Sequence, residues 1–272
     1  MLKFKQVDVF TRLPFRGNPV AVVIGAEGLD TATMQKIACW TNLSETTFLL
    51  KSDQADYRLR IFTPSMELPF AGHPTLGSAH AALESGFVKK KDRLTQECLA
   101  GVFELAVEND GKIFVKGPAP KLSDVPPIPG IDVLSPPLRV DVGAVWVVSE
   151  VRDAAYLAAL KPDLRAHAEY GVRHGLAGVT VFARSGDGET ALHVRSFAPA
   201  HGIAEDPVCG TGNISVAAYL RENGTLQRFG DRYVARQGMQ LGRDGRVHMR
   251  VEREAIYLGG DAVTCVDGRI DT

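Results

Sequence analysis

The sequence predicts an α+β protein built from two similar domains. In both halves, apolar stretches of strand length outnumber helical patterns. Seven of the fifteen prolines lie between residues 118 and 137, a composition typical of an extended linker. A motif also occurs twice, near residues 60–83 and 195–220. We therefore predict domains at residues 1–117 and 138–272, joined by a Pro-rich linker at 118–137.

The first half contains seven predicted strands and two predicted helices. The strands are expected at residues 3–10, 19–24, 45–51, 55–62, 93–99, 101–108 and 112–116. One helix begins after Asp30, a favourable N-cap, and ends near Asn42. The second begins at Pro74, a good first-turn residue, and ends at Ser85 before Gly86.

The second half follows a similar plan. Strands are expected at residues 138–142, 144–149, 177–183 and 190–197, and helices at 152–160 and 211–222. A terminal hairpin is predicted to turn at Asp244-Gly245, because Met239, Leu241, Val247, Met249 and Val251 alternate about it. In such an arrangement the last strand is free to cross back to the first domain.

The repeated motif is an ordered set of matches. Arg60-x-Phe62-x-Pro64 aligns with Arg195-x-Phe197-x-Pro199. After a three-residue insertion, Glu67, Pro69 and Gly72 align with Glu205, Pro207 and Gly210. The matches predict a duplicated domain with pseudo-twofold symmetry, in which two helix starts face each other across an interdomain cleft.

Composition limits the classes of partner. The chain has 272 residues, 45% of them apolar, with 31 basic and 32 acidic side chains and a net charge of −1. This balance gives no reason to expect nucleic acid or an anionic membrane as a partner. The apolar runs are too short to span a bilayer, and the N-terminal residues lack the apolar core of a signal peptide. We therefore expect a cytoplasmic protein.

The cysteines and histidines do not suggest a metal site. Cys39, Cys98, Cys209 and Cys265 lie far apart without a CxxC pair, which argues against a zinc site and a disulfide framework. His73 has no His or Cys partner at metal-ligand spacing.

The two helix starts are candidate anion sites. The first amides of a helix have no partner within it, and the helix dipole adds partial positive charge there. Residues 71–74 and 209–213 both offer such a start. One of them alone is better explained as a tight turn with a cap, whereas the repeated pair favours a carboxylate site that stabilises developing negative charge.

Three further side chains have two interpretations each. Glu45 lies where a helix leads into an apolar strand, so it is either a partly desolvated acid/base or a solvated loop residue; the residues alone favour the second. Asp206 either caps a turn or contacts a ligand. Cys209 is either a reactive thiol at a helix start or a small buried residue, the commoner role.

These motifs together resemble the phenazine-biosynthesis PhzF-like isomerase family, within the diaminopimelate-epimerase fold. The resemblance rests on Pro14-Phe15-x-Gly17-Asn18-Pro19, on Asn42-Leu43-Ser44-Glu45-Thr46, on residues 62–75 and on Glu205-Asp206-Pro207-x-x-Gly210-Thr211-Gly212. It implies two like domains, each a mixed sheet around a central helix, no cofactor and a homodimer.

The resemblance also implies roles for residues. Glu45 is the general acid/base, and His73 and Asp206 hydrogen-bond the substrate. The backbone around Gly72-His73 and Gly210-Thr211-Gly212 binds a small carboxylate, with Asn18 nearby. The reaction best known in the family is isomerisation of trans-2,3-dihydro-3-hydroxyanthranilate by a proton shift.

Two differences within this fold class bear on the chemistry. Diaminopimelate epimerase uses two facing cysteines, whereas this chain has Ala71 in the first position and Cys209 in the second, which excludes two-thiol epimerisation. Residues 210–213 read Gly-Thr-Gly-Asn, where the phenazine enzymes tend to have Gly-Ser-Ala-Ala. A cofactor-free isomerase is therefore the leading hypothesis. The alternatives are a one-base amino-acid epimerase or racemase, and a non-catalytic carboxylate-binding protein.

Overall fold

The structure, a computed structural model, describes all 272 residues and divides them into two compact units. Unit 1 comprises residues 1–116 and 259–272, and unit 2 comprises residues 117–258. Unit 1 ends within one residue of the predicted boundary at 117, unit 2 includes the segment predicted as a linker, and the last strand crosses back to unit 1, as the sequence analysis allowed. The C-terminal segment belongs to unit 1, because its strand pairs with the first strand of the chain.

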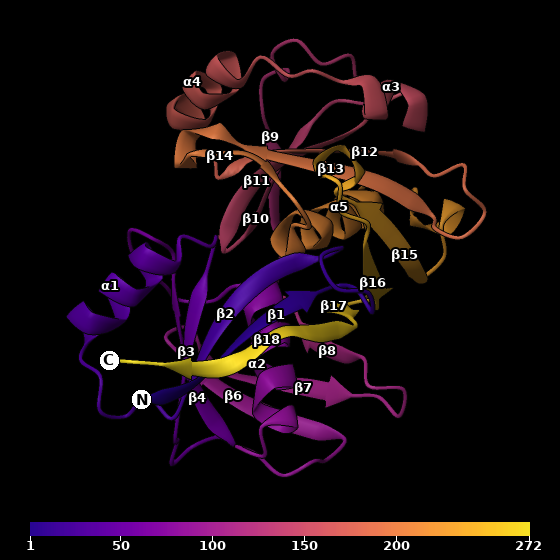
Figure 1. The fold of residues 1–272 in the computed structure, drawn as a ribbon. Helices are drawn as coiled ribbons and strands as arrows, with labels where there is room; N and C mark the ends of the chain where they lie inside the picture. Colours follow the sequence, from indigo (N-terminus) through magenta and orange to yellow (C-terminus); the bar gives the residue numbers. More distant parts are fainter. The chain divides into compact units, whose positions relative to one another are not determined.

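Unit 1 is a mixed sheet with one helix on each face. Its strands are β1 (Leu2–Val9), β2 (Asn18–Ile24), β3 (Thr46–Leu50), β4 (Tyr57–Phe62), β5 (Glu67–Leu68), β6 (Arg93–Cys98), β7 (Gly101–Val107), β8 (Ile113–Lys116) and β18 (Ala262–Ile270). Its helices are α1 (Thr31–Thr41) and α2 (Gly72–Glu84). In Figure 1 the yellow strand β18 lies beside β1, with which it pairs antiparallel.

The strand order of unit 1 is β18, β1, β2, β3, β4, β6, β7 and β8, with β5 added to the end of β4. The pairs β2–β3 and β4–β6 are parallel and the others antiparallel. Parallel neighbours need a crossover connection. The helices α1 and α2 provide these two crossovers.

The two helices of unit 1 have different environments. The amphipathic helix α1 begins at its cap Asp30, ends at Asn42 in the left-handed region, and buries Met34 and Ala38. In α2, ten of thirteen residues are buried. A Cβ added to Gly77 would lie 2.4 Å from Val20 Cγ1, so this glycine allows α2 to pack closely on β2. The central helix implied by the resemblance is therefore α2.

Unit 2 repeats this plan. Its strands are β9 (Lys121–Asp124), β10 (Leu138–Val142), β11 (Ala144–Glu150), β12 (Gly178–Arg184), β13 (Leu192–Ala198), β14 (Ile203–Asp206), β15 (Arg232–Gln237) and β16 (Gly245–Val251). Its helices are α3 (Ala154–Ala159), α4 (Leu164–His174) and α5 (Gly210–Glu222). Strand β17 (Ile256–Gly260) carries the chain back to unit 1.

The order of pairing in unit 2 matches that of unit 1. The strands run β9, β10, β11, β12, β13, β15 and β16, with β14 added to β13, and the pairs β11–β12 and β13–β15 are parallel. Ten of the thirteen residues of α5 are buried, as in α2. The helices α3 and α4 pack on β12 and β13, on the face away from α5 (Figure 1).

Four details of the structure differ from the sequence predictions. The Pro-rich segment is not a free linker, because it contains β9 and buries Ile128 and Ile131 against the core of unit 2. The first arm of the terminal hairpin is β15, whereas residues 239–241 form a 3₁₀ turn. Helix α4 was not predicted, because its apolar residues recur at every second position and not at helical spacing. Helix α2 begins at Gly72, two residues earlier than predicted.

The duplicated motif forms the same ion pair in each unit. Arg60 donates two hydrogen bonds to the carboxylate of Glu67, at 2.7 and 2.6 Å, and Arg195 donates two to Glu205, at 2.9 and 2.8 Å. The guanidinium of Arg60 lies over the ring of Phe62, and that of Arg195 over Phe197. Each fork joins a long strand to the short strand that comes next in the chain, just before the buried helix: β4 to β5 in unit 1, and β13 to β14 in unit 2.

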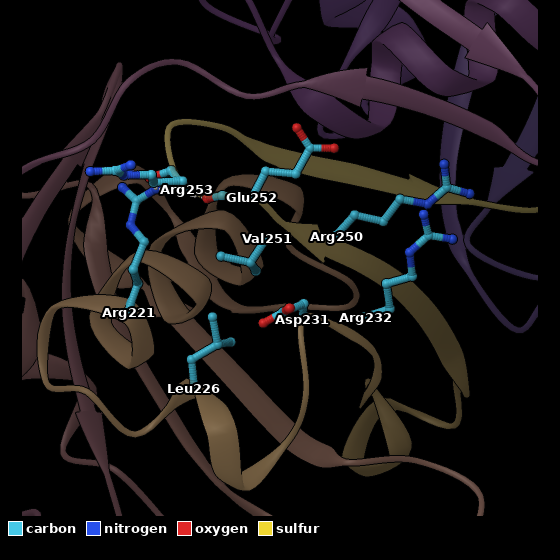
Figure 2. A pocket seen from close by; sticks show the side chains of 8 residues that line it. All are labelled: Arg221, Leu226, Asp231, Arg232, Arg250, Val251, Glu252 and Arg253. Atoms are coloured by element: carbon cyan, nitrogen blue, oxygen red, sulfur yellow. Dashed lines mark hydrogen bonds between the residues drawn. The ribbon is translucent and has the colours of Figure 1, made fainter.

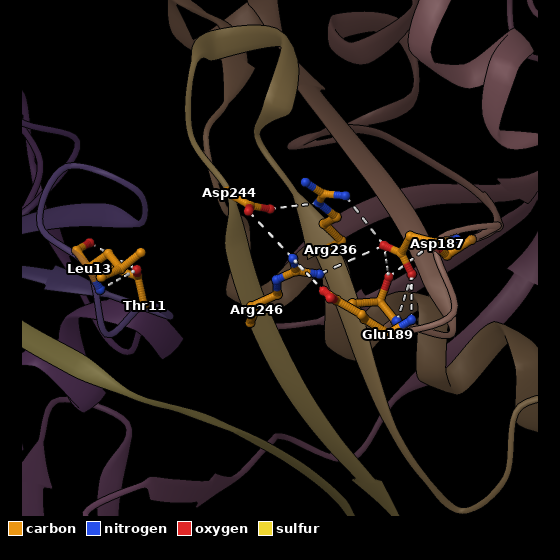
Figure 3. Close-up of polar contacts among 9 residues, drawn as sticks. Thr11, Leu13, Asp187, Glu189, Arg236, Asp244 and Arg246 are labelled. Carbon is orange, nitrogen blue, oxygen red and sulfur yellow. Dashed lines mark hydrogen bonds and ion pairs between the residues drawn. The ribbon is translucent and has the colours of Figure 1, made fainter.

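A second ion network fixes the β15–β16 hairpin (Figure 3). Arg236 and Arg246 are directly opposite in this ladder, and two like charges in such a position destabilise the strand pair. Asp187, Glu189 and Asp244 lie between 2.6 and 3.8 Å from these guanidinium groups and offset the repulsion.

Candidate active site

The position of Glu45 is fixed from both sides. Asn42 ends α1 in the left-handed conformation, which turns the chain toward β3. The hydroxyls of Thr41 and Thr46 are 2.6 Å apart and join the end of α1 to the start of β3. The carbonyl of Glu45 accepts a hydrogen bond from the amide of Ala21 in β2. Glu45 is therefore held at the start of β3 although it lies in a connection.

Burial changes the acidity of Glu45. Only 16% of its side chain is exposed. Desolvation raises the pKa of the carboxyl to about 7, although a hydrogen bond with the side chain of Ser44 acts in the opposite direction. Loss of water disfavours the carboxylate form, and no cation compensates fully. A carboxyl group with such a pKa is able to take up and release a proton near neutral pH.

His73 lies directly beside this carboxyl group. Its Nε2 is 3.3 Å from Glu45 Oε2, and its Nδ1 is 3.4 Å from Nδ2 of the buried Asn18. His73 is the second residue of α2, and only 6% of its side chain is exposed. Three residues distant in the sequence therefore form one contiguous row, Asn18, His73 and Glu45.

Gly72 is the first residue of α2, and this helix start has no side-chain cap. Its N-cap, Ala71, is extended and has no hydroxyl or carboxylate to accept an amide hydrogen bond. A helix N-terminus of this kind presents amide dipoles and partial positive charge. The uncapped end of α2 lies beside the row formed by Asn18, His73 and Glu45, because His73 belongs to both.

The other predicted residues gather at the start of α5 in unit 2. Asp206 ends β14 and accepts a hydrogen bond from the amide of Val208. Gly210, Thr211 and Gly212 form the first turn of α5. A Cβ added to Gly212 would lie 2.7 Å from Ser196 Oγ and 2.9 Å from Thr180 Oγ1, so glycine is needed beside this hydroxyl pair.

Cys209 caps α5 and is buried. Its Sγ accepts a hydrogen bond from the amide of Gly212 at 3.3 Å. Burial, reinforced by the charge of Asp206, raises the pKa of the thiol well above its usual value. The thiol is therefore protonated at neutral pH, which removes the nucleophilic and basic form.

We expect Cys209→Ser to keep most of the activity, because the serine hydroxyl preserves a hydrogen-bond acceptor for the cap. Turnover should fall by less than about tenfold, in keeping with a thiol that takes no proton from the substrate. Steady-state kinetics and circular dichroism of both proteins measure this. A loss of several hundredfold with unchanged folding would assign chemistry to the thiol.

Two buried glutamines support the helix starts and were not predicted. Gln96 in β6 donates to Thr75 Oγ1, while Gln237 in β15 accepts from the side-chain amide of Asn213. Gln237 also donates to the carbonyl of Asp206. A buried amide in a strand has no distinctive sequence pattern, because polar residues alternate there anyway.

An open groove lies elsewhere, and none of the predicted site residues lines it. Figure 2 shows this groove of about 600 Å³ in unit 2. It is lined by Arg221, Leu226, Asp231, Arg232, Arg250, Val251, Glu252 and Arg253. Its lining mixes four cations with two carboxylates.

No helix of the chain combines the length and apolarity needed to cross a membrane.

The fold and the site define the class of protein. Two copies of a mixed sheet around a buried helix, with one half-buried glutamate of raised pKa, are suited to proton transfer. The sequence profile described as "Phenazine biosynthesis-like protein" (PhzC-PhzF) matches residues 7–127 and 132–268. The chain belongs to this family, and its named relatives support assignment as an isomerase.

Three relatives show the extent of the similarity. "Antisense-enhancing sequence 1" of Schizosaccharomyces pombe is 40% identical, covering 98% of this chain and 97% of its own length. "Trans-2,3-dihydro-3-hydroxyanthranilate isomerase" of Pseudomonas aeruginosa is 34% identical, covering 99% of each chain. A crystal structure of a PhzF-family phenazine biosynthesis protein from Bacillus anthracis superimposes with a TM-score of 0.88 at 27% identity, covering 100% of this chain and 99% of its own.

Proposed function

We propose that this chain is a cofactor-independent isomerase that moves a proton between two carbons of a small carboxylate, with Glu45 as its single general acid/base. The observation that carries the proposal is the half-buried Glu45 carboxyl, with a pKa of about 7, beside His73. A carboxyl with an ordinary pKa near 4.5 would be a weaker base at neutral pH.

The proposed reaction is a balanced proton shift. The Glu45 carboxylate takes a proton from a carbon conjugated with the substrate's carboxylate, and the electron pair of the broken C–H bond spreads into the conjugated system. The protonated Glu45 then returns the proton to another carbon of that system, so neither an oxidant nor a reductant is needed. His73 and Asn18 orient the substrate, and the amides at Gly72 contribute positive potential.

The residues of unit 2 complete the proposal. We assign Asp206 to hydrogen bonding with the substrate, and the first turn of α5, Gly210, Thr211 and Gly212, to binding its carboxylate. Gly212 packs against the hydroxyls of Ser196 and Thr180, which an alanine would displace. The phenazine enzymes tend to have alanine at this position, so we propose a substrate that is related to the dihydrohydroxyanthranilate named for the Pseudomonas relative but differs from it.

The repeat itself supports a single base. At the level of the helix N-caps, the chain has Ala71 in one copy and the protonated thiol of Cys209 in the other. Neither Ala71 nor the protonated thiol of Cys209 is a base. A single residue, Glu45, that takes and returns the proton on one face of the substrate is consistent with this. We further propose a cytoplasmic homodimer.

Solvent exchange distinguishes the three candidate functions. Cyclic and acyclic amino and hydroxy acids are incubated with the protein in D₂O and followed by NMR and mass spectrometry. Deuterium at a new carbon indicates an isomerase, and deuterium at the original stereocentre indicates an epimerase. Thermal stabilisation with neither exchange nor a new product indicates binding alone, because Glu45 is able to return the original proton. An epimerase result or a binding-only result contradicts the proposal.

The pH dependence of turnover should reflect Glu45. Since the base form removes the proton, kcat/KM should rise about tenfold per pH unit below pH 7 and level off above it. Initial rates between pH 5 and 9 measure this limb. A profile flat from pH 5 to 9 would exclude a base with the raised pKa.

A further inference from the structure

The duplicated ladders allow the two units to be compared position by position. Phe62 and Phe197, which the repeat aligns, pair with the residues that directly follow Glu45 and Gly178. Gly178 therefore occupies in unit 2 the position that Glu45 occupies in unit 1. The second copy has no side chain where the first has its acid.

A buried tryptophan takes up the space at this position. Trp146 in β11 is the ladder partner of Gly178, and only 4% of it is exposed. A Cβ added to Gly178 would lie 2.8 Å from Trp146 Cζ3 and 2.1 Å from the carbonyl oxygen of Phe197. The indole ring and a larger side chain at 178 are therefore mutually exclusive.

The indole reaches the same helix position that Glu45 reaches in unit 1. Glu45 contacts His73, the second residue of α2, at 3.3 Å. Trp146 Nε1 donates a 2.9 Å hydrogen bond to Oγ1 of Thr211, the second residue of α5. One repeat thus places an acid/base against its helix start, and the other places a neutral donor there.

This hydrogen bond has a fixed direction. An indole N–H donates and cannot accept, so Thr211 Oγ1 must be the acceptor. The hydroxyl proton of Thr211 therefore points to another group. Its other contact within the protein is Cys209 Sγ, a weak acceptor at 3.8 Å that already receives the amide of Gly212. Thr211 is half-exposed, so its proton is available to a ligand.

We infer that Trp146 is a positioning residue that holds Thr211 as a hydrogen-bond donor to the carboxylate of the substrate. The inference rests on the proposed function, because it takes a small carboxylate as the ligand. A hydroxyl held in this way favours an anionic acceptor over an ammonium group, because charge-assisted hydrogen bonds are the stronger ones. Trp146 acts through Thr211 and does not itself contact the substrate.

Binding of anthranilate, used as a probe carboxylate, tests the inference without turnover. Trp146→Phe removes the N–H and keeps a ring over Gly178. Isothermal calorimetry should show a Kd about five- to tenfold higher for Trp146→Phe, the loss expected for one oriented hydrogen bond. Thr211→Val should raise Kd to a similar extent, whereas Thr211→Ser, which keeps the hydroxyl, should bind within about twofold of the parent.

A double-mutant cycle separates positioning from packing. If Trp146 acts through Thr211, then Trp146→Phe combined with Thr211→Val should bind no more weakly than Thr211→Val alone. With the substrate found by exchange, Trp146→Phe should raise KM much more than it lowers kcat. Additive losses of affinity in the double variant would overturn the inference. So would equal Kd values in the parent and Trp146→Phe, or no binding by either protein.

The indole N–H also provides a direct spectroscopic readout. The chain has two tryptophans, Trp146 and the exposed Trp40 in α1, so Trp40→Phe assigns the two indole signals in a ¹H–¹⁵N spectrum. Thr211→Val should shift the Trp146 signal upfield and leave Trp40 unchanged. An unshifted Trp146 signal contradicts the hydrogen bond itself. Failure of the proposed function would instead appear as unchanged exchange in Glu45→Gln, which leaves these binding and NMR results unaffected.

Discussion

Glu45→Gln is expected to bind ligand with nearly the parent affinity and to lose turnover by about 10²–10⁴-fold or more, the range for general acid–base catalysis. Glutamine has almost the same shape but cannot accept the proton. Deuterium incorporation and calorimetric affinity, measured side by side, test this. His73→Ala and Asp206→Asn are the comparison variants, because both should weaken binding as well as rate. If Glu45→Gln exchanged at the parent rate while Asp206→Asn did not, the base would be Asp206.

The same variant should show how the site affects stability. The pKa of Glu45 is about 7 in the folded chain and near 4.5 when unperturbed, so the folded state binds more protons between these values. The contribution of Glu45 to stability therefore falls as pH rises from about 4.5 to 7, and stays reduced above pH 7.

Glutamine has no such ionisation. Glu45→Gln should thus be more stable than the parent by about 1–3 kcal/mol at pH 8, and nearly equal to it at pH 4.5. Urea unfolding at the two pH values measures the difference. Equal stability at pH 8 would mean that Glu45 is not desolvated.

Arg195→Ala should be the most destabilising of the proposed substitutions, by about 3–5 kcal/mol. Only 6% of the Arg195 side chain and 9% of the Glu205 side chain are exposed. Arg195 also donates hydrogen bonds to the carbonyls of Leu157 and Leu160 at the C-terminal end of α3. Removing the guanidinium leaves a buried carboxylate and two carbonyls without this donor, which costs more than the ion pair itself contributes.

The repeat supplies a matched control. Arg60→Ala removes the equivalent fork in unit 1, where the exposed fractions are 16% and 18%. Water is able to replace part of that interaction, so we expect a cost of about 1–2 kcal/mol. Arg195→Met with Glu205→Leu should be less destabilising than Arg195→Ala, because no buried charge is left over. Equal losses for Arg60→Ala and Arg195→Ala in urea unfolding would contradict the burial argument.

Local sequence patterns predicted most of the helices and strands, and they predicted the duplication. Alternation of apolar residues, the cap Asp30 and the stop at Asn42 are local signals, and the structure confirms α1 and the strands around it. The Arg60–Glu67 and Arg195–Glu205 matches also anticipated two copies of one unit, since the same pair of residue types closes the same fork twice despite the three-residue insertion in the second copy. The α+β class followed from these patterns, whereas the family was implied by the resemblance of the motifs around Asn18, Glu45, His73 and Asp206.

Tertiary structure alone decided the chemical state of the site. Glu45 and His73 are 28 positions apart, and only the packing of α2 on the sheet brings them to 3.3 Å. The residues alone favoured a solvated Glu45, because burial depends on long-range contacts that local pattern does not encode, and only the family resemblance implied a catalytic role for it.

The same reason explains the other differences. Ile128 and Ile131 are buried by a core that includes β11, β12 and α4, so the segment predicted as an extended linker packs on unit 2, which its Pro-rich composition did not indicate. Trp146 and Thr211 are 65 positions apart, and their hydrogen bond follows only from ladder register and the placement of α5. Local periodicity fixes which residues face inward, whereas pKa values and side-chain partners arise from which segments finally pack together.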